Sequence, residues 1–196
     1  MANDAYLLLG SNIEPERHLA EAVVMLQRFG RISRVSRVWE SLPVDGSERP
    51  NYLNAAVVLQ TDLSAAELRL SAIDSIETSL QRVRDPGDKN ADRTIDIDVV
   101  LFNRDITTIE HRRIPDPEIA DRAFALQSLV DIDPDYVHPE TGLSLRDMLS
   151  ETPGVGQLKE RSDVDLRAAM ESRGSDASSV GLEGPVSRMP TGEDVC

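Results

Sequence analysis

The stretch between residues 93 and 102 constrains the fold of this chain more than any other, because bulky apolar side chains alternate there with polar ones. A period of two is typical of a β-strand with one buried face. Side chains at positions i and i+2 share one face of a strand, so the carboxylates of Asp96 and Asp98 point the same way. Ile95, Ile97, Val99 and Leu101 then point to the opposite face and supply the burial. The sequence therefore predicts a strand that carries two carboxylates on one face of a sheet.

The spacing of these two carboxylates is suited to binding metal ions. Their Cα atoms stand roughly 6.5–7 Å apart along an extended strand, and their oxygens can reach two hard cations about 3.5–4 Å apart. Four basic residues precede them within a short stretch: Arg82, Arg84, Lys89 and Arg93. One interpretation is a site for two Mg²⁺ ions beside a polyphosphate group. The other is a solvated strand face whose carboxylates form ordinary salt bridges.

The hydrophobic pattern of the whole chain predicts an α+β domain. Strands are expected at residues 5–10, 32–39, 52–61, 93–102 and 106–114, and helices at residues 15–29, 64–80 and 119–130. The second of these helices opens with the sequence of a capping box. Loops rich in Pro, Gly and Asp are expected at residues 42–50 and 85–88. The β-α-β-β-α-β order predicts a ferredoxin-like antiparallel sheet, with the helices packed on one face and the ligand site on the other.

Composition limits the classes of function. The chain has 196 residues and a net charge of −14, which argues against binding to nucleic acids or to anionic membranes. Its single cysteine, Cys196, excludes an intrachain disulfide, and no apolar stretch is long enough for a membrane span, so we expect a cytoplasmic protein. Residues 1–151 are expected to form the catalytic domain. The acidic, Gly- and Ser-rich residues 152–196 are expected to form a largely disordered tail, with a short amphipathic segment near residues 158–170.

Five motifs occur in the order and spacing of a known family. They are Leu9-Gly10-Ser11-Asn12, Tyr52-Leu53-Asn54-Ala55-Ala56, Arg82-Val83-Arg84, Arg93-Thr94-Ile95-Asp96-Ile97-Asp98 and Arg122-Ala123-Phe124. On the basis of these motifs, residues 4–150 resemble the 6-hydroxymethyl-7,8-dihydropterin pyrophosphokinase family. These folate-pathway enzymes move pyrophosphate from ATP to a pterin alcohol. The resemblance implies ATP and 6-hydroxymethyl-7,8-dihydropterin as substrates and two Mg²⁺ ions as cofactors. We expect a monomer.

The resemblance also implies roles for individual residues. Asp96 and Asp98 resemble the pair that holds both Mg²⁺ ions, and Arg82 and Arg93 resemble the arginines that stabilise charge on the transferring group. These four are the expected catalytic residues. The expected pterin-binding residues are Pro43, Val44, Tyr52, Asn54 and Phe124, with the two aromatic rings on either side of the pterin. The expected ATP-binding residues are Glu77, Arg82, Arg84, Lys89, Arg93, Ile97 and Arg122. The loops at 42–50 and 83–93 resemble two flaps that close over the substrates.

Several positions depart from the family pattern. Asp92 precedes Arg93 where the family usually has proline, and Asp116 stands where many members have histidine. His111 stands in place of an arginine and is expected at the surface. These changes affect the nucleotide side of the site, so we expect weaker binding of ATP than is typical of the family.

Three other interpretations of the sequence stay open. One is a paralogue that binds pterin or nucleotide without transferring pyrophosphate. The second is a ferredoxin-like regulatory module whose acidic strand face is only solvated, which needs neither the arginine pair nor a Tyr-Asn-Phe pocket. The third is nucleotidyl transfer to another alcohol, which keeps the metal ions and changes the acceptor.

Overall fold

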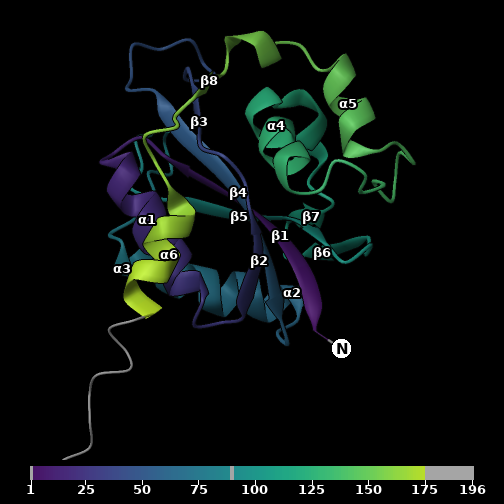
Figure 1. The fold of residues 1–196 in the computed structure, drawn as a ribbon, viewed down its shortest axis with the longest axis horizontal. Helices are drawn as coiled ribbons and strands as arrows, with labels where there is room; N and C mark the ends of the chain where they lie inside the picture. Colours follow the sequence, from purple (N-terminus) through teal and green to yellow (C-terminus); the bar gives the residue numbers. More distant parts are fainter. Residues whose placement is uncertain (1, 89–90, 175–196) are drawn as a thin grey trace, which may run out of the picture.

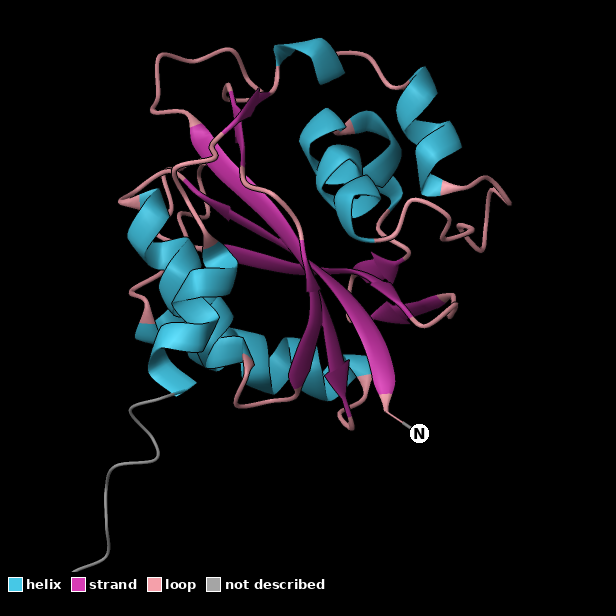
Figure 2. Ribbon diagram, viewed as in Figure 1, coloured by secondary structure: helices cyan, strands magenta, loops and turns pink. Residues whose placement is uncertain are grey.

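The computed structural model describes residues 2–88 and 91–174 and shows a mixed α/β domain around an antiparallel sheet (Figure 1, Figure 2). In this part of the chain the strands of the sheet follow the order β5-β1-β4-β3-β8, and β2 also pairs with β4. Their bounds are β1 Asn3–Ser11, β2 Arg31–Val35, β3 Trp39–Ser41, β4 Tyr52–Thr61, β5 Asp96–Phe102 and β8 Lys159–Glu160. The central strand β1 pairs antiparallel with β4 on one side and with β5 on the other. This order places β5 beside β1, with Asp98 opposite Leu8 and Asp96 opposite Gly10.

Helices cover both faces of the sheet, so the prediction that they pack on one face is wrong (Figure 1). The helical elements of the domain are α1 Pro15–Leu26, α2 Ala65–Glu67, the π-helix η1 Leu68–Ile73, α3 Asp74–Ser79, the 3₁₀-helix η2 Pro117–Asp121, α4 Ala123–Ile132, α5 Leu145–Glu151, the 3₁₀-helix η3 Val155–Gln157 and α6 Leu166–Gly174. α1, the continuous segment from α2 to α3, and α6 pack on one face, and α4 with α5 packs on the other. The crossover rule fixes the face of helices that connect two strands of a sheet. It does not fix the face of α4, which follows the last long strand, and this explains the difference.

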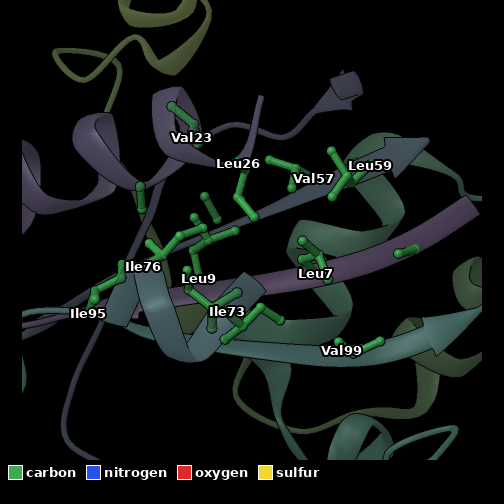
Figure 3. Close-up of a cluster of buried hydrophobic side chains, with 14 of the residues drawn as sticks. Leu7, Leu9, Val23, Leu26, Val57, Leu59, Ile73, Ile76, Ile95 and Val99 are labelled. Carbon is green, nitrogen blue, oxygen red and sulfur yellow. The ribbon is translucent and has the colours of Figure 1, made fainter. Parts of the chain in front are cut away.

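The face that each side chain occupies follows from the alternation along β1 and β4. Leu7 and Leu9 lie with Val57 and Leu59 beneath α1 and α3, in the cluster of buried side chains that Figure 3 shows. The residues between them, such as Val58 between Val57 and Leu59, face α4 instead. Burying one such leucine contributes roughly 1.5–3 kcal/mol. The register of the sheet is therefore strongly fixed, because a slip of one residue would exchange the two faces.

The capping box predicted at the start of the second helix is confirmed. Ser64 Oγ accepts a hydrogen bond from Glu67 N (3.3 Å), and Glu67 Oε2 accepts one from Ser64 N (2.9 Å). These two bonds satisfy backbone donors that the first turn of a helix leaves free. They define the start of the helical segment that carries Glu77 toward the site.

Two of the predicted strands are each broken into shorter ones. The expected strand at 106–114 is a hairpin of β6 (Thr107–Ile109) and β7 (Arg112–Ile114), with Glu110 at a φ of 54° in the turn. The expected strand at 32–39 is interrupted at Ser36, whose Oγ accepts a hydrogen bond from Ala56 N (2.8 Å). Neither break contains glycine or proline, the residues that normally mark a turn in a sequence.

The chain stays folded beyond residue 151, where the sequence analysis placed the end of the domain. β8 pairs with β3, and Arg161 forms an ion pair with Glu40 of that strand (3.4 Å). Leu166 of α6 is 3% exposed and belongs to the core cluster beneath α1. The rest of the expected tail, residues 175–196, lies outside the described residues. A single buried leucine within a polar segment is too weak a signal for a sequence pattern, which explains the difference.

Candidate active site

β5 presents both aspartates on the face of the sheet that also carries α4. Asp96 and Asp98 are partly exposed while Ile97 and Val99 are buried, which confirms the predicted alternation as far as Val99. The prediction is wrong for Leu101, which lies in the cluster beneath α4, because the register between β1 and β5 shifts there. Both aspartates line a cavity of about 680 Å³ next to the start of α4, where Phe124 lines the same cavity. This volume lies within the range of about 300–1,000 Å³ that is usual for small-molecule sites.

Each aspartate is paired with at least one arginine. Arg93 Nη1 donates to Asp96 Oδ2 (2.6 Å), and Arg82 Nη2 lies 3.9 Å from Asp96 Oδ1. Asp98 accepts a hydrogen bond from the guanidinium of Arg112. Burial, and secondarily the charge of Asp96, raise the pKa of the Asp98 carboxyl. Three guanidinium groups thus lie around the two carboxylates, and guanidinium groups are the side chains that bind phosphate oxygens best.

Arg82 is held in the protein interior although it carries a charge. Its side chain is 8% exposed, and burial lowers the pKa of its guanidinium. Its Nη1 donates to the carbonyl oxygen of Val83 (2.8 Å), whereas its buried Nε has no hydrogen-bond partner among the described residues. An unsatisfied buried donor costs about 1–3 kcal/mol, more for charged groups. Arg82 does not line the cavity, so its side chain would have to move to contact a bound anion.

Arg93 is positioned by the turn that follows β1. Its backbone N–H donates to Asn12 Oδ1 (2.7 Å), and its carbonyl oxygen accepts hydrogen bonds from Asn12 N (3.1 Å) and Ile13 N (3.2 Å). Asn12 Nδ2 also donates to Asp92 Oδ1 (2.7 Å). The unusual Asp92 is thus engaged by Asn12, and the turn at residues 11–13 fixes the backbone from which Arg93 reaches Asp96.

The expected pterin-binding residues lie together around the same cavity. Tyr52 at the start of β4, Phe124 at the start of α4, and Pro43 and Val44 from the loop at 42–50 all line it. The guanidinium of Arg93 lies 5.8 Å from the centre of the Tyr52 ring. Aromatic and apolar walls beside a positive group are suited to a flat ring that carries polar atoms.

Asn54 has a fixed orientation on the floor of the cavity. Its Nδ2 donates to Ser41 Oγ (2.9 Å) and to the carbonyl oxygen of Trp39 (3.2 Å). Its Oδ1 lies near Gly10, where a Cβ atom would come within 3.5 Å of it. The side chain is 4% exposed. The amide is therefore held in one orientation by β3, as a group that recognises a polar edge requires.

The expected ATP-binding residues are divided between the cavity and its surroundings. Arg93 and Arg122 line the cavity. Glu77 and Ile97 are buried beneath it, where Glu77 Oε1 accepts a hydrogen bond from Ile97 N (3.0 Å), and burial raises the pKa of Glu77. Arg84 forms an ion pair with Glu77, and Arg82 lies beside Asp96. Lys89 lies outside the described residues.

The β6–β7 hairpin contributes residues to the site that no sequence motif predicted. His111, Arg112 and Arg113 all line the cavity, as does Asp116, whose pKa is raised by burial. His111 is exposed, as expected, yet it lies at the rim of the site. The cluster of arginines at 112–113 is visible in the sequence. Only the tertiary structure shows that Arg112 contacts Asp98, so spacing along the chain could not have revealed this pair.

An ion pair joins the two loops that resemble flaps. Arg49 Nη2 lies 2.5 Å from Asp88 Oδ2, so the loop at 42–50 is linked to the loop that precedes Arg93. Leu42, Pro43 and Val44 of the first loop line the cavity. The ion pair therefore restrains the loop at 42–50, which forms one wall of the cavity.

The aspartate pair fits a divalent cation by the chemistry of its donors. Carboxylate oxygens are hard ligands, and Mg²⁺ is commonly bound by one or two carboxylates together with water and phosphate oxygens. Among the described residues no group of three or more His, Cys, Asp or Glu side chains could form a complete metal cage. Asp96 and Asp98 thus suit a cation that a phosphate ligand shares. In the same part of the chain no helix has both the length and the apolar character needed to cross a membrane.

Carboxylates and arginines beside an aromatic slot, on this α/β fold, are typical of enzymes that transfer phosphate-containing groups. A family model for 7,8-dihydro-6-hydroxymethylpterin-pyrophosphokinase (HPPK) matches residues 6–134. The chain belongs to this family and is therefore a pyrophosphokinase, a transferase of folate synthesis.

Similar proteins support this assignment. The 2-amino-4-hydroxy-6-hydroxymethyldihydropteridine pyrophosphokinase of Bacillus subtilis is 33% identical over 175 residues, which cover 88% of this chain and 100% of that protein. The protein of the same name from Pseudomonas aeruginosa is 31% identical over 159 residues, covering 80% and 96%. A crystal structure of Plasmodium falciparum HPPK-DHPS with pteroate matches with a TM-score of 0.62 and 16% identity, over 77% of this chain and 43% of that chain. This last likeness shows the fold alone.

Proposed function

We propose that this enzyme transfers pyrophosphate from ATP to the hydroxymethyl group of 6-hydroxymethyl-7,8-dihydropterin, with release of AMP, and that it requires Mg²⁺. The observation that carries the proposal is that one cavity brings Asp96, Asp98 and Arg93 next to Tyr52 and Asn54. The first three groups suit a phosphate chain. The other two suit a flat heterocycle with a polar edge.

The reaction is one displacement at the β-phosphorus of ATP. The hydroxymethyl oxygen forms a bond to this phosphorus, and the bond between the phosphorus and the oxygen that joins it to AMP breaks. The electron pair of the broken bond leaves with AMP, and the hydroxyl proton is released. No covalent bond to the protein is needed, so the residues act by binding and orientation.

Two arginines are suited to stabilise charge on the transferring group. Arg93 is positioned by Asn12 through its backbone, so little conformational freedom remains to be lost when it binds phosphate. Arg82 lies beside Asp96, and its guanidinium would have to turn toward the cavity to contact the phosphate chain. Arg122, which pairs with Glu118 at the entrance of the cavity, would contact the nucleotide.

Asp96 and Asp98 would hold two Mg²⁺ ions. When bound, the ions would neutralise charge on the phosphate oxygens and help to align the attacking and leaving oxygens. The two side chains project from one rigid strand and line the cavity, and a phosphate chain and water would complete the coordination. Their own arginine partners keep them in place when no ion is present.

On the other side of the cavity, Tyr52 and Phe124 would stack on the two faces of the pterin. Asn54 would bind the polar edge of the ring with an amide that Ser41 and β3 already orient. The loop with Pro43 and Val44 would cover the bound ring. The hydroxymethyl group then points toward the aspartate pair, where the phosphate chain lies.

The test is an assay of AMP release by the purified protein. With ATP, 6-hydroxymethyl-7,8-dihydropterin and Mg²⁺ present, AMP should form at the same rate as the pyrophosphorylated pterin. Omitting the pterin or adding EDTA should stop both. Formation of ADP, or AMP formation that does not depend on the pterin, would contradict the proposal.

The nucleotide side carries one departure with a direct electrostatic consequence. Asp116 lines the cavity and adds negative charge near Asp98, at a position where many family members have histidine. We propose that ATP binds more weakly here than is typical of the family. Titration calorimetry with an unhydrolysable ATP analogue and Mg²⁺ tests this, and an ordinary affinity would contradict it.

The overall organisation supports three further proposals. The strand order β5-β1-β4-β2, with α1 and the α2–α3 segment as crossovers, supports a ferredoxin-like description of the sheet. We also propose that the protein is a monomer and that it is cytoplasmic. Sedimentation velocity of the purified protein tests the first of these two, and cell fractionation tests the second.

A further inference from the structure

Arg112 reaches Asp98 from an anchored hairpin. Ile109 and Ile114 of this hairpin are buried in the core, and Arg112 pairs with Ile109 across it. The segment after the hairpin is tied to β5, because the backbone N–H of Asp116 donates to the carbonyl oxygen of Val100 (2.9 Å). The base of the Arg112 side chain is therefore fixed close to the aspartate pair.

The three arginines at the aspartates are held in different ways. The side chains of Arg82 and Arg93 are 8% and 14% exposed, and each has a further hydrogen bond to a backbone carbonyl oxygen. The side chain of Arg112 is 39% exposed, and within the described residues it has no hydrogen-bond partner besides Asp98. Arg112 is therefore the arginine that can leave its aspartate at the lowest cost.

We propose that Arg112 is a placeholder cation for Asp98, which it neutralises until a divalent cation binds there. Asp98 needs such a partner because Asp96 and Asp116 both place negative charge near it. When the divalent cation takes its place, Arg112 turns into the cavity that it lines and contacts the phosphate chain of the nucleotide. This inference rests on the proposed function, in which the aspartates bind Mg²⁺ and the same cavity binds ATP.

The inference predicts opposite effects on two ligands. Without the Arg112 charge, a divalent cation no longer competes for Asp98, so binding of the cation alone becomes tighter. The nucleotide loses a guanidinium contact, so its binding in the presence of Mg²⁺ becomes weaker. A residue that only supported the shape of the site would shift both affinities in the same direction or neither.

The experiment uses titration calorimetry on the full chain and an Arg112→Met variant, with Mn²⁺ alone and with α,β-methylene-ATP plus Mg²⁺. Mn²⁺ should bind about fivefold more tightly to the variant, the size expected for a partly exposed ion pair. The nucleotide analogue should bind about tenfold more weakly, the size of one charge-assisted hydrogen bond. Arg112→Lys keeps the charge and should retain the wild-type affinity for Mn²⁺.

Arg146→Met is the matched control, because it removes the same charge at a residue that does not line the cavity. Arg146 is 62% exposed and pairs with the exposed Asp135. The control variant should change neither affinity. Unchanged or weaker Mn²⁺ binding by the thermally stable Arg112→Met variant would overturn the inference, as would unchanged binding of the analogue. If the wild-type protein bound neither ligand, the proposed function itself would fail, which is a different outcome.

Discussion

Glu77 allows a quantitative test of how the aspartate strand is held from beneath. Its side chain is 3% exposed, and its Oε1 accepts a hydrogen bond from the backbone N–H of Ile97, the residue between the two aspartates (3.0 Å). Glu77→Ala removes this acceptor and leaves a buried N–H unsatisfied, which costs about 1–3 kcal/mol. The lost ion pair with the half-exposed Arg84 adds little. A loss of about 2 kcal/mol corresponds to a fall in Tm of roughly 4–8 °C for a chain of this size.

Glu77→Gln is the matched control because it keeps an oxygen for the Ile97 N–H. Burial raises the pKa of Glu77 above its ordinary value of 4.5, so the carboxyl binds a proton more readily in the folded protein than in the unfolded chain. The stabilising contribution of this group is fully present below pH 4.5 and is lost as the pH rises through the folded-state pKa. The Gln variant does not titrate there. The Gln variant should therefore be at least as stable as the wild type at pH 7. The difference in the free energy of unfolding between the two proteins should be smaller near pH 4.5.

The melting temperatures of both variants are measured by circular dichroism during thermal unfolding, at pH 7 and at acidic pH. Glu77→Ala should melt several degrees below Glu77→Gln at pH 7. Equal melting temperatures of the Ala variant and the wild type would refute the reasoning, because Ile97 N–H would then have another partner. If the melting temperature of the Gln variant fell as far as that of the Ala variant, the negative charge of Glu77 would be what stabilises the fold.

Three further predictions concern the site and the C-terminal segment. Asp96→Ala and Asp98→Ala should each lower the rate of AMP release more than about a hundredfold, since the metal ions contribute several kcal/mol to stabilising the transition state. Circular dichroism should show an intact fold in both variants. Near-normal turnover would contradict the metal assignment. Leu166→Ala should lower the free energy of unfolding in urea by about 2–4 kcal/mol because the side chain is fully packed, and an unchanged midpoint would show that α6 does not contribute to stability. Arg49→Met should raise KM by up to about fivefold, because it breaks the partly exposed ion pair with Asp88. Asp88→Asn should raise KM by the same factor. If the two effects add in the double variant, the two side chains do not act as a pair.

The parts of the molecule that local patterns control could be predicted from the sequence. Alternation along residues 93–102 placed Asp96 and Asp98 on one face, and the structure confirms that arrangement. The capping box at Ser64 fixed the start of a helix because its two hydrogen bonds are local. Motifs in register gave the family, which the family model confirms.

Features that depend on tertiary contacts could not be predicted in this way. The contact of Arg112 with Asp98 joins a hairpin to a strand edge, and no periodicity records it. The position of α4 on the second face depends on a connection without a crossover, as described above. The C-terminal segment has few apolar residues, yet Leu166 and the ion pairs of Arg161 attach it to the domain.

The pairing of β8 with β3 has a consequence for solubility. Within the described residues β8 occupies the outer side of β3, whose backbone donors and acceptors would otherwise be open to another chain. Unprotected strands of this kind can recruit strands from neighbouring molecules and start aggregation. β8 therefore covers the free edge of β3 against pairing with another molecule, in addition to its part in folding.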